Sequence, residues 1–282
     1  MHHIGQKEIS LWDDVDNFYY DVVEMSNGTT DRLKVRSLVG IIPLFAVEII
    51  HKDLFEELKY FKVKAAEIVR TRPDLASLVS NIEEFNEDGN YLFSIMRGFR
   101  LEKLLYRMLD EDEFLSEFGI RSLSKYHEKH PFVFQHNGHH QIQYESGESR
   151  SNMFGGNSNW RGPIWMPLNY MIIQSLRKYY LFYGDQYVYE FPTRSGNKLN
   201  LNEIANELSK RLIKLFQPNA DGKFQYHSED VNKVFTKNEH FKNEHFFYEF
   251  FDGDSGKGLG ASHQTGWTAL VANLIIELEQ NS

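Results

Sequence analysis

Residues 163–184 read PIWMPLNYMIIQSLRKYYLFYG, and this stretch decides the fold class. Pro163 suits the first turn of a helix, and Gly184 suits the position just after the last turn. Apolar side chains recur between them every three or four residues, which is the spacing of one helix face. The other positions are largely apolar too, so we expect a helix that is buried on nearly every side. The repeating positions are Trp165, Leu168, Ile172, Leu176, Tyr179 and Tyr183.

The same helical spacing recurs on both sides of this stretch. Asn200 and Glu203 have the spacing of a capping box, which predicts a helix that begins there and ends before Pro218. Residues 53–71 predict an amphipathic helix with charged residues opposite its apolar face. Further helices are expected at 73–82, 89–109, 111–118 and 265–279.

Two long loops rich in polar and aromatic residues separate the helices, at 126–160 and 221–263. They are too long for simple connections in a helical bundle, so they are candidates for a functional rim. Within the first loop, residues 132–134 and 141–144 flank Asn137-Gly138 and predict a hairpin. Helices that alternate with long loops and almost no strand predict an all-α fold with one elaborate face.

The composition excludes several classes of protein. The 282 residues contain 31 Lys and Arg against 40 Asp and Glu, and the net charge of −9 comes with no basic cluster that could bind nucleic acid. The longest uncharged apolar runs, at 37–47 and 266–276, are shorter than the ~20 residues that a membrane helix needs. There is no Cys, which excludes disulfides, Cys zinc sites and thiol nucleophiles. The lack of Cys, and of a signal peptide at residues 1–7, favours a cytoplasmic location.

An arginine lies between two tryptophans in the segment NWRGPIW at 159–165. Trp160 and Trp165 offer stacking faces, and Arg161 offers fixed hydrogen-bond donors beside the start of the expected helix. This arrangement suits a polyhydroxylated ligand. The alternative is that both tryptophans anchor the core and that Arg161 pairs with a buried carboxylate.

Glu249 lies between two pairs of aromatic residues in the segment FYEFF at 247–251. Burial among rings would raise the pKa of its carboxyl group and favour proton transfer. The alternative is a solvated or ion-paired glutamate. The four glycines between 253 and 260 form a pliable loop that can approach a ligand closely or act as a mobile turn.

Other patterns that look like motifs carry no chemistry. The glycines between 253 and 260 do not follow an expected strand and lack the Ser or Thr of a phosphate loop, so we expect no nucleotide cofactor. His136, His139 and His140 have loose metal-ligand spacing, but histidines in a polar loop are more typical of a surface. We therefore expect neither a cofactor nor a metal.

Five motifs resemble those of the catalytic module of glycoside hydrolase family 63 and its relatives, the processing-glucosidase and mannosylglycerate-hydrolase enzymes. They keep their order and span almost the whole chain. The segments NWRGPIW at 159–165 and GASHQTGWTAL at 260–270 carry most of the likeness, because coincidence is improbable over such lengths. The five motifs lie at 11–21, 35–46, 118–124, 157–165 and 258–269.

The resemblance implies an (α/α)6 toroid and a hydrolase that inverts the anomeric centre, with a Glu general base and an Asp general acid. Glu249 matches the position of the base. The substrate would be an oligosaccharide or small glucoside with an α-glucosidic bond, held by the residues around Glu249. Those residues would be Trp160, Arg161, Trp165, His263, Gln264 and Trp267.

The general acid is where the sequence departs from the family pattern. In the resembled enzymes it lies in an Asp-Gly-Thr-x-Trp-Met segment upstream of the motif at 11–21, and no such segment occurs here. We therefore expect residues 1–282 to be one partial catalytic domain, from a longer, monomeric enzyme whose acid lies outside this chain. Asp14 and Asp21 are the fallback acids. The alternatives to an enzyme are a non-catalytic, carbohydrate-binding toroid and a helical scaffold.

Overall fold

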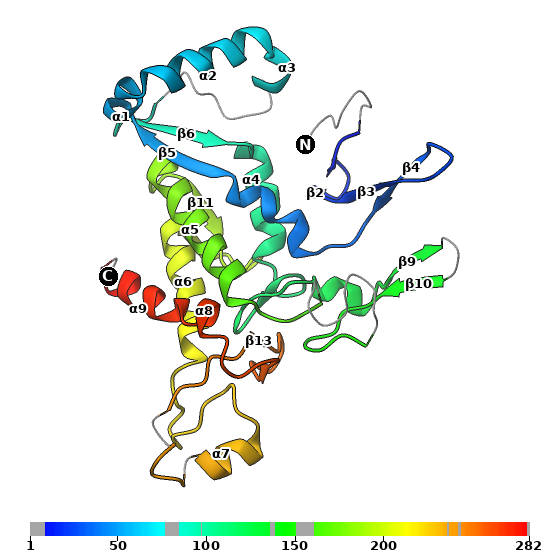
Figure 1. The fold of residues 1–282 in the computed structure, drawn as a ribbon, viewed down its shortest axis with the longest axis vertical. Coiled ribbons are helices and arrows are strands. Elements are labelled where there is room, and N and C mark those ends of the chain that lie inside the picture. Colours follow the sequence, from blue (N-terminus) through cyan, green and yellow to red (C-terminus); the bar gives the residue numbers. More distant parts are fainter. Residues whose placement is uncertain are drawn as a thin grey trace.

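The computed structural model places a group of helices at the centre of the molecule (Figure 1). α5 (Met166–Tyr183) and α6 (Leu201–Lys214) lie side by side, and α9 (Leu270–Gln280) packs against both. α4 (Gly98–Met108) buries Leu101, Leu104 and Leu105 in the same core. The described residues are 9–76, 85–96, 98–135, 139–150, 161–235, 237–241 and 244–280.

α6 forms where the capping box predicts it. The backbone N–H of Glu203 donates to Asn200 Oδ1 at 2.9 Å, and the N–H of Asn200 donates to Glu203 Oε2 at 2.8 Å. These two bonds satisfy amides that the first turn leaves without helical partners. The predicted apolar stripe is buried, and its members Ile204, Leu208, Leu212 and Leu215 are all inaccessible to solvent.

α5 confirms the long helix, but Met171 and Leu181 are 45% and 52% exposed, so it is not buried on nearly every side, and it begins later than the sequence suggested. Ile164 is extended, because it forms antiparallel bridges to both Arg121 and Phe251. Pro167, not Pro163, therefore lies in the first turn, and Gly184 ends the helix with a φ of 66°. No helix in the described ranges is both long enough and apolar enough to span a membrane.

The amphipathic helix expected at 53–71 is two helices, α1 (Lys52–Glu57) and α2 (Lys59–Thr71). The break falls at Leu58, whose ψ of 56° is not helical. α2 extends over the β5–β6 ribbon in Figure 1. Its apolar face is only partly covered by the described residues: Phe61 packs against Phe93, with ring centroids 5.7 Å apart, yet Phe61 and Ile68 remain 41% and 51% exposed.

The expectation of almost no strand is wrong, because the described residues contain seven two-stranded antiparallel sheets. Two of them replace expected helix. Residues 90–94 pair with 47–51, so the helix expected from residue 89 begins only at Gly98. Residues 111–118 form a turn and a short strand, because Asp110 Oδ1 accepts from the N–H of Asp112 and so competes with a helical turn.

The strands connect segments that are near in sequence, apart from the β5–β6 pair. The hairpin predicted in the first long loop is confirmed, with Phe132 opposite Ile142, and the turn at Asn137-Gly138 lies outside the described residues. The strands are β1 (Trp12–Asp13), β2 (Phe18–Tyr19), β3 (Asp21–Glu24), β4 (Thr30–Leu33), β5 (Val47–His51), β6 (Asn90–Ser94), β7 (Leu115–Ser116), β8 (Gly119–Ile120), β9 (Phe132–Gln135), β10 (His139–Ile142), β11 (Val188–Glu190), β12 (Lys198–Asn200), β13 (Phe250–Phe251) and β14 (Gly258–Leu259).

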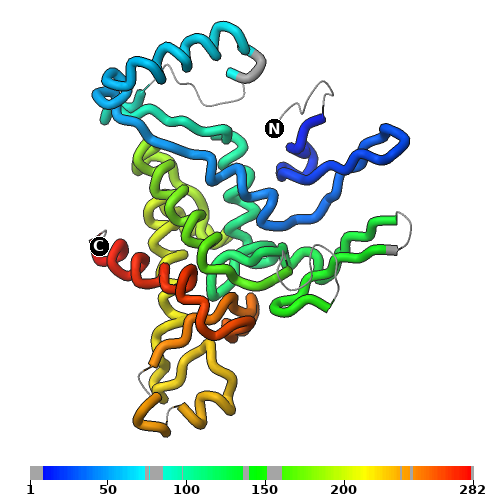
Figure 2. The backbone as a smooth tube through the Cα atoms, in the orientation of Figure 1, coloured from blue at the N-terminus to red at the C-terminus, as the bar shows by residue number. Residues whose placement is uncertain are grey.

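The second long loop extends away from the central helices beyond the end of α6 (Figure 2). It carries α7 (Glu229–Phe235). The last predicted helix is divided at Ala269 into α8 (Thr265–Thr268) and α9. The remaining short helices are α3 (Pro73–Ala76) and the 3-10 turns Leu38–Gly40, Ile42–Phe45 and Lys125–Glu128.

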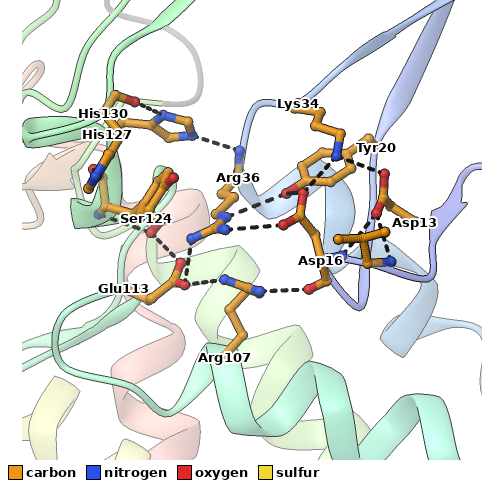
Figure 3. A network of polar contacts seen from close by, with 12 residues as sticks. Asp13, Asp16, Tyr20, Lys34, Arg36, Arg107, Glu113, Ser124, His127 and His130 are labelled. Carbon is orange, nitrogen blue, oxygen red and sulfur yellow. Dashed lines mark hydrogen bonds and ion pairs between the residues drawn. The ribbon is translucent and has the colours of Figure 1, made fainter.

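A polar network fixes the N-terminal segment to the body of the molecule (Figure 3). Glu113 is at its centre, where Arg36 Nη1 lies 2.9 Å from Oε1 and Ser124 Oγ donates to Oε2 at 2.6 Å. Arg107 Nη1 donates to the same Oε1, and Arg107 Nη2 donates to the carbonyl of Asp16 at 2.6 Å. Arg36 and Asp16 belong to the segment before β5, so this network joins that segment to α4 and to the residues after it.

His127 makes the stability of this network sensitive to pH. Its Nε2 accepts the backbone N–H of Arg36 at 2.9 Å, so Nδ1 carries the proton and donates to the carbonyl of His130 at 2.8 Å. Burial, with Arg36 nearby, lowers the pKa of His127 to about 4. An unfolded histidine, with a pKa near its usual 6.5, binds a proton that the folded one does not.

We therefore expect the contribution of His127 to be complete above about pH 6.5 and to be lost as the pH falls toward about 4. The free energy of unfolding should drop by roughly 2 kcal/mol from this residue between about pH 7.5 and pH 5. Urea denaturation of the wild type and of His127→Gln at both pH values measures the drop. An equal pH dependence in the two proteins would contradict the assignment.

Candidate active site

Two distant segments meet at the start of α5. Ile164 and Phe251 exchange backbone hydrogen bonds, with N to O distances of 2.7 and 2.9 Å, and Phe251 is also paired with Gly258. The end of the NWRGPIW segment is therefore directly beside the segment that carries Glu249. The side chains of Ile164 and Phe251 are fully buried, so this small ladder is a rigid base for the residues on either side of it.

Glu249 is half-buried, and the loop opposite holds one of its carboxylate oxygens. The backbone N–H of Glu249 donates to the carbonyl of Ala261 at 2.8 Å, and the N–H of Ala261 donates to Glu249 Oε2 at 3.2 Å. Within the described residues, Oε1 accepts no hydrogen bond and the carboxylate has no ion pair. One oxygen is thus held by the backbone, and the other meets no hydrogen-bond donor from the described residues.

Aromatic rings border this carboxylate. Trp165 is buried and stacks on Phe250, the neighbour of Glu249, with ring centroids 4.7 Å apart. Trp267 is half-buried, and its ring centroid lies 5.6 Å from that of Trp165. Its indole N–H is buried and finds no acceptor among the described residues. Trp267 therefore combines a ring face with an unused donor.

His263 and Gln264 lie on the other side of the same segment. The backbone of His263 bridges Phe247, and its ring centroid lies 5.5 Å from that of Phe246. The backbone N–H of Gln264 donates to the carbonyl of Phe247 at 2.7 Å. His263 is exposed and Gln264 is half-buried. The structure thus gathers Glu249, Trp165, His263, Gln264 and Trp267 around residues 246–251.

Arg161 is more deeply buried than these residues, with a side chain that is 1% exposed. Its Nε donates to Ser149 Oγ at 2.9 Å and lies 3.7 Å from Glu145 Oε2. Burial lowers the pKa of Arg161, and Glu145 opposes this shift. Arg161 thus has the carboxylate partner of the alternative interpretation, and a sugar-binding role for it stays a prediction. Trp160 lies outside the described residues.

The glycine-rich loop after Glu249 is anchored by side chains at its tip. Asp254 Oδ1 accepts from Arg121 Nη2 and from the hydroxyl of Tyr144, both at 3.0 Å. Burial raises the pKa of Asp254, but the bonds from Arg121 and Tyr144 outweigh it and the pKa is lowered. Asp252 accepts from Ser146 Oγ at 2.7 Å. These bonds hold the loop in one position, so it is not a loose turn.

A polar cleft of about 690 Å³ opens beside this glycine-rich loop. Glu145, Ser146, Asp252 and Lys257 are among the residues that line it. The sequence interpretation had singled out the loop but neither Tyr144 nor Glu145. In the sequence, the one sign of the contacts that hold Asp254 is Arg121, which lies in the motif at 118–124.

Comparison with known proteins identifies the family to which this arrangement belongs. The model of the glycosyl hydrolase family 63 C-terminal domain matches residues 93–277. The chain belongs to this family. The resemblance seen in the sequence motifs is thereby confirmed.

Three curated relatives illustrate the family 63 relationship. An uncharacterized protein of Saccharomyces cerevisiae is 45% identical over 273 residues, which are 95% of this chain and 25% of that protein. The mannosyl-oligosaccharide glucosidase of the same yeast is 27% identical over 62% of this chain and 15% of its own length. A probable mannosyl-oligosaccharide glucosidase of Schizosaccharomyces pombe is 29% identical over 70% and 19%, respectively. The chain thus spans a quarter or less of the length of these relatives.

The two fallback acids lie on a different part of this family 63 chain. Asp14 is exposed in the turn between β1 and β2, and Asp21 is exposed at the start of β3. In Figure 1 these strands are well separated from β13, which follows Glu249. Within the described residues no cluster of three or more His, Asp or Glu side chains could hold a metal ion, and His136 lies outside those residues.

Gly260 controls the position of the Glu249 carboxylate. Its φ is 67°, and a Cβ placed there would lie 2.6 Å from Glu249 Oε2. We expect Gly260→Ala to displace the carboxylate and to lower turnover by up to ~10²-fold, because a displacement of about 1 Å has such effects in active sites. Sugar hydrolysis by the longest form of the protein that contains this chain measures the effect.

Gly222→Ala is the matched control for this variant. Gly222 also has a positive φ, of 73°, but a Cβ there would meet no atom within 4 Å. Gly222→Ala should lose stability from backbone strain alone, measured by urea denaturation, and Gly260→Ala should lose more because of its contacts; only Gly260→Ala should lose activity. Equal activity in the two variants would contradict the positioning role.

Proposed function

We propose that this chain forms the C-terminal part of one catalytic domain in an inverting glycoside hydrolase, with Glu249 as its general base. The substrate in this proposal is an oligosaccharide or small glucoside with an α-glucosidic bond. The observation that carries it is the Glu249 carboxylate, with one oxygen held by Ala261 N–H and the other without a partner among the described residues, in a segment packed against aromatic rings. Family 63 membership and the glucosidase names of two relatives support the same reaction class.

The proposed reaction needs a water molecule between Glu249 and the sugar. The free oxygen of Glu249 takes a proton from that water as the water oxygen bonds to the anomeric carbon. The bond to the leaving oxygen breaks, and the general acid donates a proton to that oxygen. In an inverting enzyme the two carboxyl groups lie about 6.5–9.5 Å apart to make room for the water. We place the acid outside this chain, because Asp14, in the turn after β1, and Asp21, on β3, lie well apart from β13, which follows Glu249.

The aromatic residues would hold the sugar in this proposal. The half-buried ring of Trp267 offers a face for the C–H groups of a pyranose. Gln264 and His263 add polar groups beside it. Trp165 packs against Trp267, with ring centroids 5.6 Å apart. Arg161 and Trp160 complete the predicted set of sugar-binding residues.

Three further features belong to the proposal. We infer that the helices form part of an (α/α)6 toroid, which the packing of α5, α6 and α9 around one core favours. We also propose that the full-length enzyme is a monomer. Its location in this proposal is the cytoplasm, since the chain contains no Cys.

The anomer of the released sugar tests the proposal. The longest form of the protein that contains this chain is incubated with α-linked gluco-oligosaccharides, and the first product is followed by proton NMR. We expect β-glucose to appear first, with the α anomer rising only by mutarotation. Initial release of α-glucose would contradict inversion. Sugar binding without any product would instead favour the non-catalytic, carbohydrate-binding alternative.

A further inference from the structure

A groove of about 450 Å³ lies between α4 and the β11–β12 hairpin. Tyr106 on α4 and Tyr187 just before β11 line it, and their side chains are 56% and 45% exposed. The buried side chains of Leu105 and Leu109 lie beneath them. The groove therefore has an apolar floor and two tyrosine rings that meet solvent.

Polar side chains with unused hydrogen-bonding capacity surround these rings. Glu102, Gln186 and Lys198 line the groove, and none of them makes a side-chain hydrogen bond or an ion pair with another described residue. Some charged residues elsewhere on the surface are paired, as Lys214 is with Glu117 and Lys210 is with Glu207. The groove thus keeps acceptors and donors available to a ligand.

The mixture of groups indicates the chemistry of that ligand. The carboxylates of Glu102 and Glu190 and the ammonium groups of Lys103 and Lys198 occur together, so the lining favours neither an anion nor a cation. A sugar ring presents C–H groups to an aromatic face and hydroxyls that both donate and accept. We propose that this groove binds a neutral oligosaccharide at a site separate from Glu249.

The β12 edge of the groove and the candidate active site lie at opposite ends of α6. β12 borders the groove through Lys198 and leads directly into the N-terminal end of α6. At the other end, the ring centroid of Phe216 lies 5.9 Å from those of Phe247 and Phe251, which flank Glu249. A helix of 14 residues is about 20 Å long. The groove is therefore an additional site, and it does not depend on the proposed hydrolysis.

Calorimetric titration of the longest form of the protein that contains this chain with maltoheptaose, cellohexaose and mannohexaose tests the proposal. We expect at least one of these sugars to bind and the double variant Tyr106→Ala/Tyr187→Ala to weaken that binding by roughly tenfold or more. Tyr106→Phe/Tyr187→Phe keeps both rings and should retain most of the affinity, which separates the loss of a stacking face from a loss of folding. Tyr60→Ala is the matched control, because Tyr60 lies on α2 and is 78% exposed.

Trp267→Ala distinguishes the groove from the candidate active site. Binding that survives Trp267→Ala and weakens in Tyr106→Ala/Tyr187→Ala supports the groove. Binding that is lost in Trp267→Ala but unchanged in the double tyrosine variant overturns it, since the sugar would then bind only near Glu249. The absence of millimolar binding for all three sugars would overturn it as well.

Discussion

Glu249→Gln is expected to lower the turnover number by about 10²–10⁴-fold, the usual contribution of a general base. Glutamine has the shape of glutamate, and its side-chain oxygen can still accept the N–H of Ala261 as Oε2 does now. It cannot take a proton from water at neutral pH. The binding of substrate should therefore persist with a KM within a few-fold of the wild type, while the chemical step is lost. Steady-state hydrolysis of α-linked gluco-oligosaccharides by the longest form of the protein measures both constants.

Glu244→Gln is the matched control for this experiment. Glu244 belongs to the same loop and is exposed, so its substitution should leave both constants unchanged. Activity retained in Glu249→Gln would contradict the assignment of the base. A rise in KM with an unchanged turnover number would make Glu249 a binding residue instead, because only a group that acts in the transition state lowers turnover in this way.

The parts of the fold that could be predicted from sequence depend on neighbouring residues. The capping box of Asn200 and Glu203 and the stripe on α6 involve residues within a few turns of each other, and both are present. The strand at 90–94 was missed because its partner, at 47–51, is about forty residues away and imposes a pairing that no local periodicity reports. The short helix expected at 111–118 failed because the side chain of Asp110 closes a turn there.

The same distinction, between residues that are near in sequence and residues that are distant, applies to the candidate site. Glu249 and the segment at 263–267 were found because their motifs are short and continuous in sequence. The hydrogen bonds that hold Asp254 were not predicted, since Arg121 and Tyr144 come from segments that are more than a hundred residues away. Burial of Arg161 beside Glu145 likewise depends on a contact between separate segments. Sequence motifs thus identified the candidate residues, and the structure supplied the contacts that position them.

The second large effect is expected at Glu113, which joins the N-terminal segment to the rest of the chain. Its side chain is 11% exposed and accepts from Arg36, Arg107 and Ser124. Glu113→Ala removes the negative charge and leaves both guanidinium groups, which are 12% and 17% exposed, without it. Removing one partner of a buried ion pair costs about 3–5 kcal/mol, because the remaining charge stays desolvated. We therefore expect the free energy of unfolding to fall by that amount in urea denaturation.

Glu117→Ala provides the comparison, because Glu117 is four residues further along and is also paired with a cation, but it is exposed and has Lys214 as its one side-chain partner among the described residues. Its side chain is 64% exposed beside Lys214, and water screens such a pair, so its loss should cost no more than ~1 kcal/mol. Equal losses in the two variants would mean that Glu113 acts as an ordinary surface charge. A large loss in Glu113→Ala alone, together with faster proteolysis of the segment before β5, would establish that this one carboxylate fixes the N-terminal segment against α4.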